Sequence, residues 1–434
     1  MRRTLRLVAA LIVLTAPLSA QAPTPVAVTG MDPARLARID RVMQAAVDSG
    51  KVPGVVTMIF RHGKLAQVGA YGMADREANR RMTPETMFRI ASQSKAVTSV
   101  AIMMLMEEGR VLLNDPVSRW IPGFARTTVA VARDTLMMGT SGPQRVAAGA
   151  TTVPARRGIT IRDLLTHTAG IDYGYDTLVR PQYNAVGLGP DEGPGWYFAD
   201  RTVPVCEDID HLATLPIVAQ PGTRYVYGYN TDILGCVVER ASGLSLAEFF
   251  RTRIFQPLGM KDTYFFLPPE KVSRLAAVYS MRDGQIVRAP DGNAGQGHYV
   301  TGPRVSYSGG AGLVSTARDY ARFLQMLLNG GQLDGVRLLS PATVRLMTAD
   351  AADSLYSANA PGRGFSLGFE VLEDPGLAGE YGTPGRFGWG GAYGTNYWAD
   401  PGDDLVAVYM VQWYGYGNDL PGRFRQLVYS AIVR

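Results

Sequence analysis

The feature that most constrains the fold is a helical segment that is apolar on almost every side. Residues 96–108 read Ala-Val-Thr-Ser-Val-Ala-Ile-Met-Met-Leu-Met-Glu-Glu, and Gly109 follows in a position typical of helix C-termini. A helix with this pattern has no face suited to water, so it is buried on most sides. The chain must therefore surround it with other elements, and 434 residues are enough for that.

The remaining patterns indicate an α+β architecture. A helix is expected over 34–48, and residues 54–68 predict a β-hairpin that turns at His62-Gly63. The C-terminal third predicts a helix over 317–328 and strands near 364–372, 394–399 and 404–412. We expect residues 34–111 and 266–434 to form an α/β region around a central sheet, with 112–265 inserted as a mainly helical region. An irregular run over 172–205 is a candidate lid, because long irregular segments are often functional.

The N-terminus has the pattern of a secretory signal peptide. Arg2, Arg3 and Arg6 flank the start of a short apolar stretch over 7–18, and small residues follow. We expect residues 1–20 to be removed, 21–33 to form a linker, and the protein to be periplasmic or secreted; an uncleaved anchor is the alternative. Without these arginines the charge balance falls from 43 − 38 = +5 to 40 − 38 = +2, which gives no basis for nucleic-acid binding.

Cysteine and histidine residues bear on stability and on metal binding. Export favours a disulfide between Cys206 and Cys236, which would stabilise the fold by roughly 3–4 kcal/mol, and two buried free thiols are the alternative. The four histidines are scattered without zinc-ligand spacing, so we expect no metal and no other cofactor. We also expect no obligate protein partner and no stable membrane span.

Ser92 and Lys95 stand three residues apart at the start of the apolar helix. This spacing places both side chains on one face, and the helix N-terminus supplies backbone N–H groups that favour negative charge near Ser92. Burial favours the neutral form of a lysine, which could then act as a general base. The alternative is a structural one, with Ser92 as a helix cap and Lys95 reaching toward solvent.

Two further segments carry candidate site residues. In the aromatic run 225–230, Tyr227 could direct its phenol at Ser92 and relay a proton, although a tyrosine there could also be packed in the core. The glycine-rich run 387–394 precedes a strand and permits close approach of a ligand, with a main-chain N–H completing an oxyanion hole; a glycine-rich bulge is the alternative.

A third segment imitates a nucleophile motif. Gly364-Phe-Ser366-Leu-Gly368 matches Gly-x-Ser-x-Gly, which requires a following helix and a later histidine. A strand pattern follows instead, and no histidine occurs after His298. Ser366 is therefore not expected to be a nucleophile.

Taken together, these segments resemble the serine hydrolases related to class C β-lactamases and D-Ala-D-Ala peptidases, and most closely family VIII carboxylesterases. The resemblance covers residues 34–430 and implies a β-lactamase/transpeptidase-like fold, with an antiparallel sheet flanked by helices and an active site between the α/β region and the inserted region. Its supporting segments are 88–95 (Phe-Arg-Ile-Ala-Ser-Gln-Ser-Lys), 113–122, 161–170, 257–263 and 308–316.

The resemblance implies specific roles for the site residues. Ser92 matches the nucleophile, Lys95 the motif lysine and Tyr227 the tyrosine of the second motif. Trp389-Gly390-Gly391 matches the third motif, and Ala392 the residue whose N–H joins that of Ser92 in the oxyanion hole. Trp389, Gly390, Gly391 and Tyr229 are expected to bind substrate, while the position of His167 looks structural.

The expected function is hydrolysis of short-chain carboxylic esters through an acyl-enzyme on Ser92. Gly228-Tyr229 and Trp389 depart from the polar and cationic residues that β-lactamases use, which points away from efficient β-lactam hydrolysis. A D-Ala-D-Ala peptidase, an amidase or a weak β-lactamase is the alternative, followed by a non-catalytic penicillin-binding-like module.

Overall fold

A computed structural model describes residues 26–139, 142–192, 197–293, 295–415 and 419–433. The expected signal peptide and the first part of the linker lie outside these residues. Within them, none of the helices combines the length and the apolar character needed to cross a membrane.

An eight-stranded antiparallel sheet forms the centre of the α/β region, in the order β12-β13-β14-β15-β16-β1-β2-β3. Two neighbouring inner strands, β16 (Leu405–Val411) and β1 (Gly54–Arg61), come from opposite ends of the chain. β1 turns into β2 (Lys64–Asp75) at His62-Gly63, as the sequence predicts, and both turn residues have positive φ. The other strands are β3 (Arg80–Arg81), β12 (Arg363–Phe365), β13 (Glu370–Leu372), β14 (Phe387–Gly390) and β15 (Asn396–Asp400).

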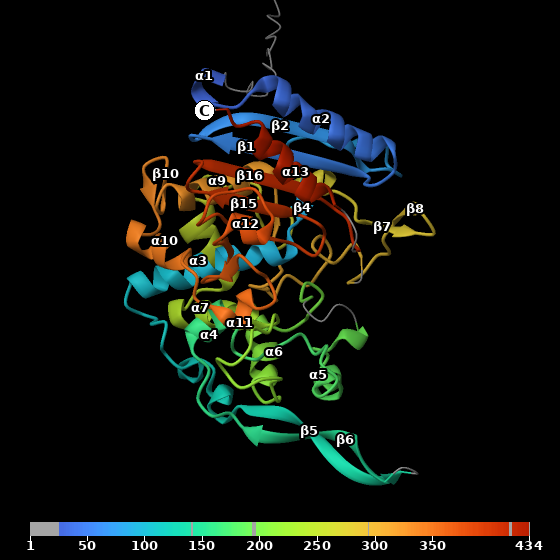
Figure 1. Cartoon of the computed structure of the whole chain (residues 1–434), viewed down its shortest axis with the longest axis vertical. Coiled ribbons are helices and arrows are strands. Elements are labelled where there is room, and N and C mark those ends of the chain that lie inside the picture. The colour runs from blue at the N-terminus through green and yellow to red at the C-terminus, as the bar shows by residue number, and fades with distance from the viewer. Residues whose placement is uncertain (1–25, 140–141, 193–196, 294, 416–418, 434) are drawn as a thin grey trace, which may run out of the picture.

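Helices cover both faces of this sheet. α2 (Pro33–Asp48) packs on α13 (Leu420–Ser430) over one face, while α9 (Ala317–Leu328) contacts β16 and β1 from the other (Figure 1). α3 (Ser94–Glu107) lies beyond α9, and its residues 94–105 are all buried. The all-round burial expected for this helix is therefore confirmed, and so is the α+β fold with its antiparallel sheet.

The segment between residues 112 and 265 lies on the far side of α3 from the sheet. It contains α4 (Ile161–Leu165), α5 (Arg180–Ala185), α6 (Val205–Leu212), α7 (Asn230–Ser242) and α8 (Leu246–Phe250). It also contains a long hairpin, β5 (Thr128–Gly139) with β6 (Gly142–Pro154), which projects from the end of the molecule (Figure 1). The sequence predicted a mainly helical region here and did not predict this hairpin. The alternation of Val129 and Val131 with alanine suits a strand, because β-branched residues fit a pleated surface.

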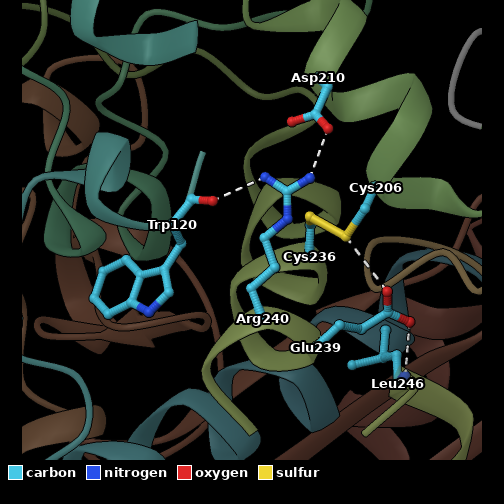
Figure 2. The surroundings of a disulfide bond; sticks show 7 residues. All are labelled: Trp120, Cys206, Asp210, Cys236, Glu239, Arg240 and Leu246. Atoms are coloured by element: carbon cyan, nitrogen blue, oxygen red, sulfur yellow. Dashed lines mark hydrogen bonds and ion pairs between the residues drawn. A yellow bond between two sulfur atoms is a disulfide. The ribbon is translucent and has the colours of Figure 1, made fainter. Parts of the chain in front are cut away.

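The structure joins Cys206 of α6 to Cys236 of α7 by a disulfide, with Cα atoms 5.2 Å apart (Figure 2). The carboxyl group of Glu239 lies 3.3 Å from the Cys206 sulfur and accepts a hydrogen bond from the Leu246 N–H. Burial raises the pKa of this carboxyl group. The bridge ties α6 to the helix whose first turn lies beside the candidate site.

A partly buried ion cluster joins α13 to the end of the sheet. Glu380 accepts hydrogen bonds from Arg363 of β12, from Arg386 just before β14 and from Arg425 of α13. Burial alone would raise the pKa of Glu380, but the three guanidinium groups outweigh it and lower the pKa to about 2. A carboxylate with a depressed pKa stabilises the fold above its unfolded pKa, and that stabilisation is lost as the pH falls through the folded pKa.

We therefore expect Glu380→Gln to lower the free energy of unfolding by about 2–3 kcal/mol at about pH 7, and by roughly half as much at about pH 3. Urea denaturation at both pH values measures this difference. The exposed Glu270 offers a matched control, because Glu270→Gln removes a carboxylate outside the cluster. An equal loss for Glu380→Gln at the two pH values would contradict the assignment.

Candidate active site

Ser92 lies in a one-turn 3₁₀ helix, Ala91–Gln93, that leads into α3. The residue before it, Ala91, is fully buried and has a φ of 40°, in the left-handed region. This conformation costs a non-glycine residue on the order of 1–3 kcal/mol and persists only where the surroundings enforce it. Here the surroundings include the short strand just before the turn, in which Phe88 pairs with Ser315 and Arg89 pairs with Val314. Ser92 itself stays partly exposed, so the strained turn presents its hydroxyl to a ligand.

Lys95 is 3% exposed, and its ammonium nitrogen has three oxygen partners. Nζ lies 3.3 Å from Ser92 Oγ, 3.0 Å from the Tyr173 hydroxyl and 2.8 Å from the Gly310 carbonyl oxygen. The predicted Ser92–Lys95 pair is therefore in hydrogen-bond reach, with the amine held from two other sides. An amine in this place can take the proton of Ser92 during nucleophilic attack.

Tyr227 lies beside the pair, but its hydroxyl is turned toward another residue. Lys95 Nζ is 4.7 Å from the centre of the Tyr227 ring, and the Tyr227 oxygen accepts a hydrogen bond of 3.2 Å from the Trp389 indole. The sequence led us to expect the phenol to be aimed at Ser92. The structure instead places the face of the ring over the amine, in a cation–π arrangement.

Tyr173 is the site residue that sequence reasoning missed. Its hydroxyl is the phenol that contacts Lys95, and its ring meets the Tyr227 ring edge-on at 5.9 Å. Burial first, and then the charge of Tyr227, raise the pKa of Tyr173 well above its ordinary value, so the group stays protonated. No spacing rule connects residue 173 with residue 95, and the chain contains 21 tyrosines, so nothing local marked this one.

His167 supports Tyr227 and takes no visible part in the chemistry. Its ring packs 4.6 Å from the Tyr227 ring, and its Nδ1 accepts a hydrogen bond from the Asn230 amide. Burial, and then the charge of Lys95, lower the pKa of His167 well below its ordinary value. The ring is therefore neutral at neutral pH, in keeping with the structural position implied for it.

The segment Trp389-Gly390-Gly391-Ala392 runs from β14 to the turn beside the nucleophile. A side chain at Gly391 would meet the Ile90 carbonyl oxygen at 2.3 Å, so only glycine lets the two segments approach. This close approach brings the exposed Ala392 next to the segment that carries Ser92. In the residues that the structure describes, the Ala392 N–H has no acceptor, which leaves it free to hold an oxyanion.

Tyr229 does not belong to the substrate pocket, contrary to the expectation from sequence. Its side chain is fully buried, its hydroxyl donates to the Leu188 carbonyl oxygen, and its ring packs 4.8 Å from that of Tyr173. The physical reason is that Tyr229 immediately precedes α7, which begins at Asn230, and the chain turns inward at this point. Tyr229 therefore stabilises the aromatic core behind the site.

Ser366, the serine of the imitating motif, is also excluded as a nucleophile. It is fully buried between β12 and β13, and its hydroxyl donates to the Phe369 carbonyl oxygen. The strand expected near 364–372 is thus two short strands with a turn, where Gly368 has a φ of 110°. Over the described residues, no group of His, Cys, Asp and Glu side chains is arranged to hold a metal ion.

Comparison with known proteins places the chain in a family. The pattern described as "Beta-lactamase" matches residues 39–429. The chain belongs to the beta-lactamase family. The match covers the sheet, α3 and the inserted region together, and it confirms the resemblance seen in the sequence.

Relatives within the beta-lactamase family include proteins with reported activities. Esterase EstB of Burkholderia gladioli is 32% identical over 417 residues, covering 92% of this chain and 97% of EstB. An uncharacterized protein of Mycobacterium tuberculosis is 39% identical over 377 residues, covering 84% of this chain and 87% of that protein. Among solved structures, EstCE1, described as a hydrolase with promiscuous acyltransferase activity, has a TM-score of 0.77 and 29% identity, with 93% and 100% of the two chains covered. The protein is thus a hydrolase of the beta-lactamase fold.

Proposed function

We propose that this protein hydrolyses short-chain carboxylic esters through an acyl-enzyme intermediate on Ser92. The observation that carries the proposal is the 3.3 Å contact between Lys95 Nζ and Ser92 Oγ, on a strained turn that leaves the hydroxyl accessible. The esterase activity named for EstB supports the substrate class, since that relative aligns with 92% of this chain.

In the proposed acylation step, Ser92 Oγ attacks the ester carbonyl carbon while its proton passes to the Lys95 and Tyr227 pair. The N–H groups of Ser92 and Ala392 hold the oxyanion, and each such donor is worth about 3–4 kcal/mol of transition-state stabilisation in comparable sites. The carbon–oxygen bond to the leaving group then breaks, and the alcohol departs with the transferred proton. Water, deprotonated by the same pair, attacks the acyl carbon of the acyl-enzyme. The bond from that carbon to Ser92 Oγ then breaks, the pair returns the proton to Oγ, and the carboxylic acid leaves.

The residues at the third motif favour an ester over a β-lactam or a peptide carboxylate. Trp389 occupies the position where a β-lactamase has a cationic side chain, and its indole N–H donates a hydrogen bond to the Tyr227 hydroxyl. Gly228 offers no side chain to a substrate amide, and a Cβ there would meet the Ile171 carbonyl oxygen at 2.4 Å. A substrate carboxylate would therefore lack its usual charged partner at this position.

A substrate panel tests the proposal. We expect turnover of p-nitrophenyl acetate and butyrate, and slow or undetectable turnover of nitrocefin and of a D-Ala-D-Ala peptide. Faster turnover of nitrocefin or of the peptide would overturn the ester assignment in favour of a β-lactamase or a peptidase. Failure of a fluorophosphonate probe to label the folded protein, with no turnover of any substrate, would indicate a non-catalytic binding module.

We further propose that the protein is exported and acts in the periplasm or outside the cell. The signal-like N-terminus supports this, and so does the disulfide, because such bridges persist in oxidising compartments. N-terminal sequencing of the natural protein is the test, and a chain that still begins at Met1 in the cytoplasm would refute it.

A further inference from the structure

Asp232 is a fully buried carboxylate in the first turn of α7, close to the site but outside every motif considered above. Its Oδ1 accepts hydrogen bonds from the Ser308 hydroxyl at 2.5 Å and from the Gly310 N–H at 3.0 Å. Ser308 Oγ in turn accepts the Ala311 N–H at 2.9 Å. One carboxylate therefore fixes the conformation of the loop from 308 to 311.

The two glycines of this loop have no room for a side chain. A Cβ on Gly310 would lie 2.4 Å from Asp232 Oδ2, and one on Gly309 would lie 2.7 Å from the Thr231 carbonyl oxygen. The Gly309 carbonyl oxygen accepts the hydroxyl of Thr98, which is on α3. Trapped between α7 and α3, the loop aims the next carbonyl oxygen, that of Gly310, at Lys95 Nζ, 2.8 Å away.

Electrostatic attraction also links Asp232 to Lys95. Burial raises the pKa of Asp232, and the attraction of Lys95 is the foremost effect that opposes this rise. In the part of the chain described here, Asp232 Oδ2 has no hydrogen-bond partner. A buried carboxylate left half unsatisfied is costly and needs a compensating charge, which Lys95 supplies.

We propose that Asp232 is a positioning residue for Lys95: it aims the Gly310 carbonyl oxygen at the amine and supplies the opposing charge that holds the ammonium between catalytic steps. This inference rests on the proposed function, because it takes Lys95 as the group that accepts the Ser92 proton. The other titratable groups that face the pair are His167, Tyr173, Tyr227 and Tyr229. None of these four groups is a carboxylate.

Asp232→Asn tests the proposal, because it keeps an acceptor for Ser308 and Gly310 but removes the charge. The variant lacks the negative charge that the proposal places opposite the Lys95 amine. We therefore expect the acidic limb of the kcat/KM profile for p-nitrophenyl butyrate to move to lower pH by about 1 unit, and kcat to fall about tenfold or more. KM should change little.

Asp319→Asn is a matched control. Asp319 is likewise a buried carboxylate in the first turn of a helix, and it accepts the Asp262 N–H and the Thr263 hydroxyl, but in α9. We expect it to retain the wild-type acidic limb. If Asp232→Asn keeps that limb as well, or loses no more activity than the control, the positioning role is refuted.

The outcomes separate this inference from the proposed function. If the wild-type protein hydrolyses no ester, the proposed function itself fails. If the wild type and Asp319→Asn are active and Asp232→Asn does not fold, Ser308→Ala decides, because it removes one of the two bonds to the carboxylate. A severalfold loss of kcat at unchanged KM would then support the inference, and unchanged kcat would overturn it.

Discussion

Ser92→Ala is expected to lower kcat/KM for p-nitrophenyl butyrate by about 10⁴-fold or more, while the free energy of unfolding changes by less than about 1 kcal/mol. The physical reason is that the acyl-enzyme cannot form without Oγ, whereas the half-buried hydroxyl contributes little to packing. Its hydrogen bond to Lys95 is the one from which the proposed reaction starts. Steady-state kinetics and urea denaturation measure the two quantities.

Ser366→Ala is the control for this experiment. Ser366 sits in the sequence motif that imitates a nucleophile, but its hydroxyl is bonded to the Phe369 carbonyl oxygen in a buried turn. We expect wild-type kcat/KM with a loss of about 1 kcal/mol in stability, from the missing hydrogen bond. Activity retained by Ser92→Ala and lost in Ser366→Ala would exchange the roles of the two serines and refute the mechanism.

Tyr227→Phe is expected to lower kcat by about 10²- to 10⁴-fold, and Tyr173→Phe by about tenfold. Tyr227 lies between the Trp389 indole and the Lys95 amine, and in the proposed mechanism it passes a proton to the leaving group and takes one from water. Tyr173 instead accepts a hydrogen bond from Lys95. When that phenol is lost, Lys95 still donates a hydrogen bond to the Gly310 carbonyl oxygen, so we expect a smaller effect.

Pre-steady-state kinetics distinguishes the roles of the two tyrosines, Tyr227 and Tyr173. If Tyr227 helps to activate water, Tyr227→Phe should accumulate acyl-enzyme and show a burst of nitrophenol followed by slow turnover. Tyr173→Phe should slow turnover without a new burst. A larger loss in Tyr173→Phe than in Tyr227→Phe would mean that the phenol in contact with Lys95 relays the proton, and that the residue predicted from the sequence is the supporting one.

Much of the fold could be predicted because its signals are local. The all-round apolar pattern of residues 96–108 requires a central buried helix, and His62-Gly63 supplies the positive φ values of a tight hairpin turn. The long hairpin β5–β6 was missed because its alternating pattern, Val129 and Val131 with alanine, is short and therefore ambiguous within a helix-rich region. Residues 364–372 were read as a single strand for a similar reason, since the turn at Gly368 lies against α3, where an added Cβ would be 2.3 Å from Ser99 Oγ, and that packing is not visible in the local sequence.

The sequence by itself determined the family, the buried helix and the Ser92–Lys95 pair, because residues three apart on one helix meet wherever that helix lies. Only the tertiary structure decided that Tyr173 and the Gly310 carbonyl oxygen hold the amine, that Tyr229 packs in the core and that Asp232 stands behind the loop. These contacts join residues far apart in the chain. Their geometry follows from how α7 and the sheet pack against α3, and no local periodicity records that packing.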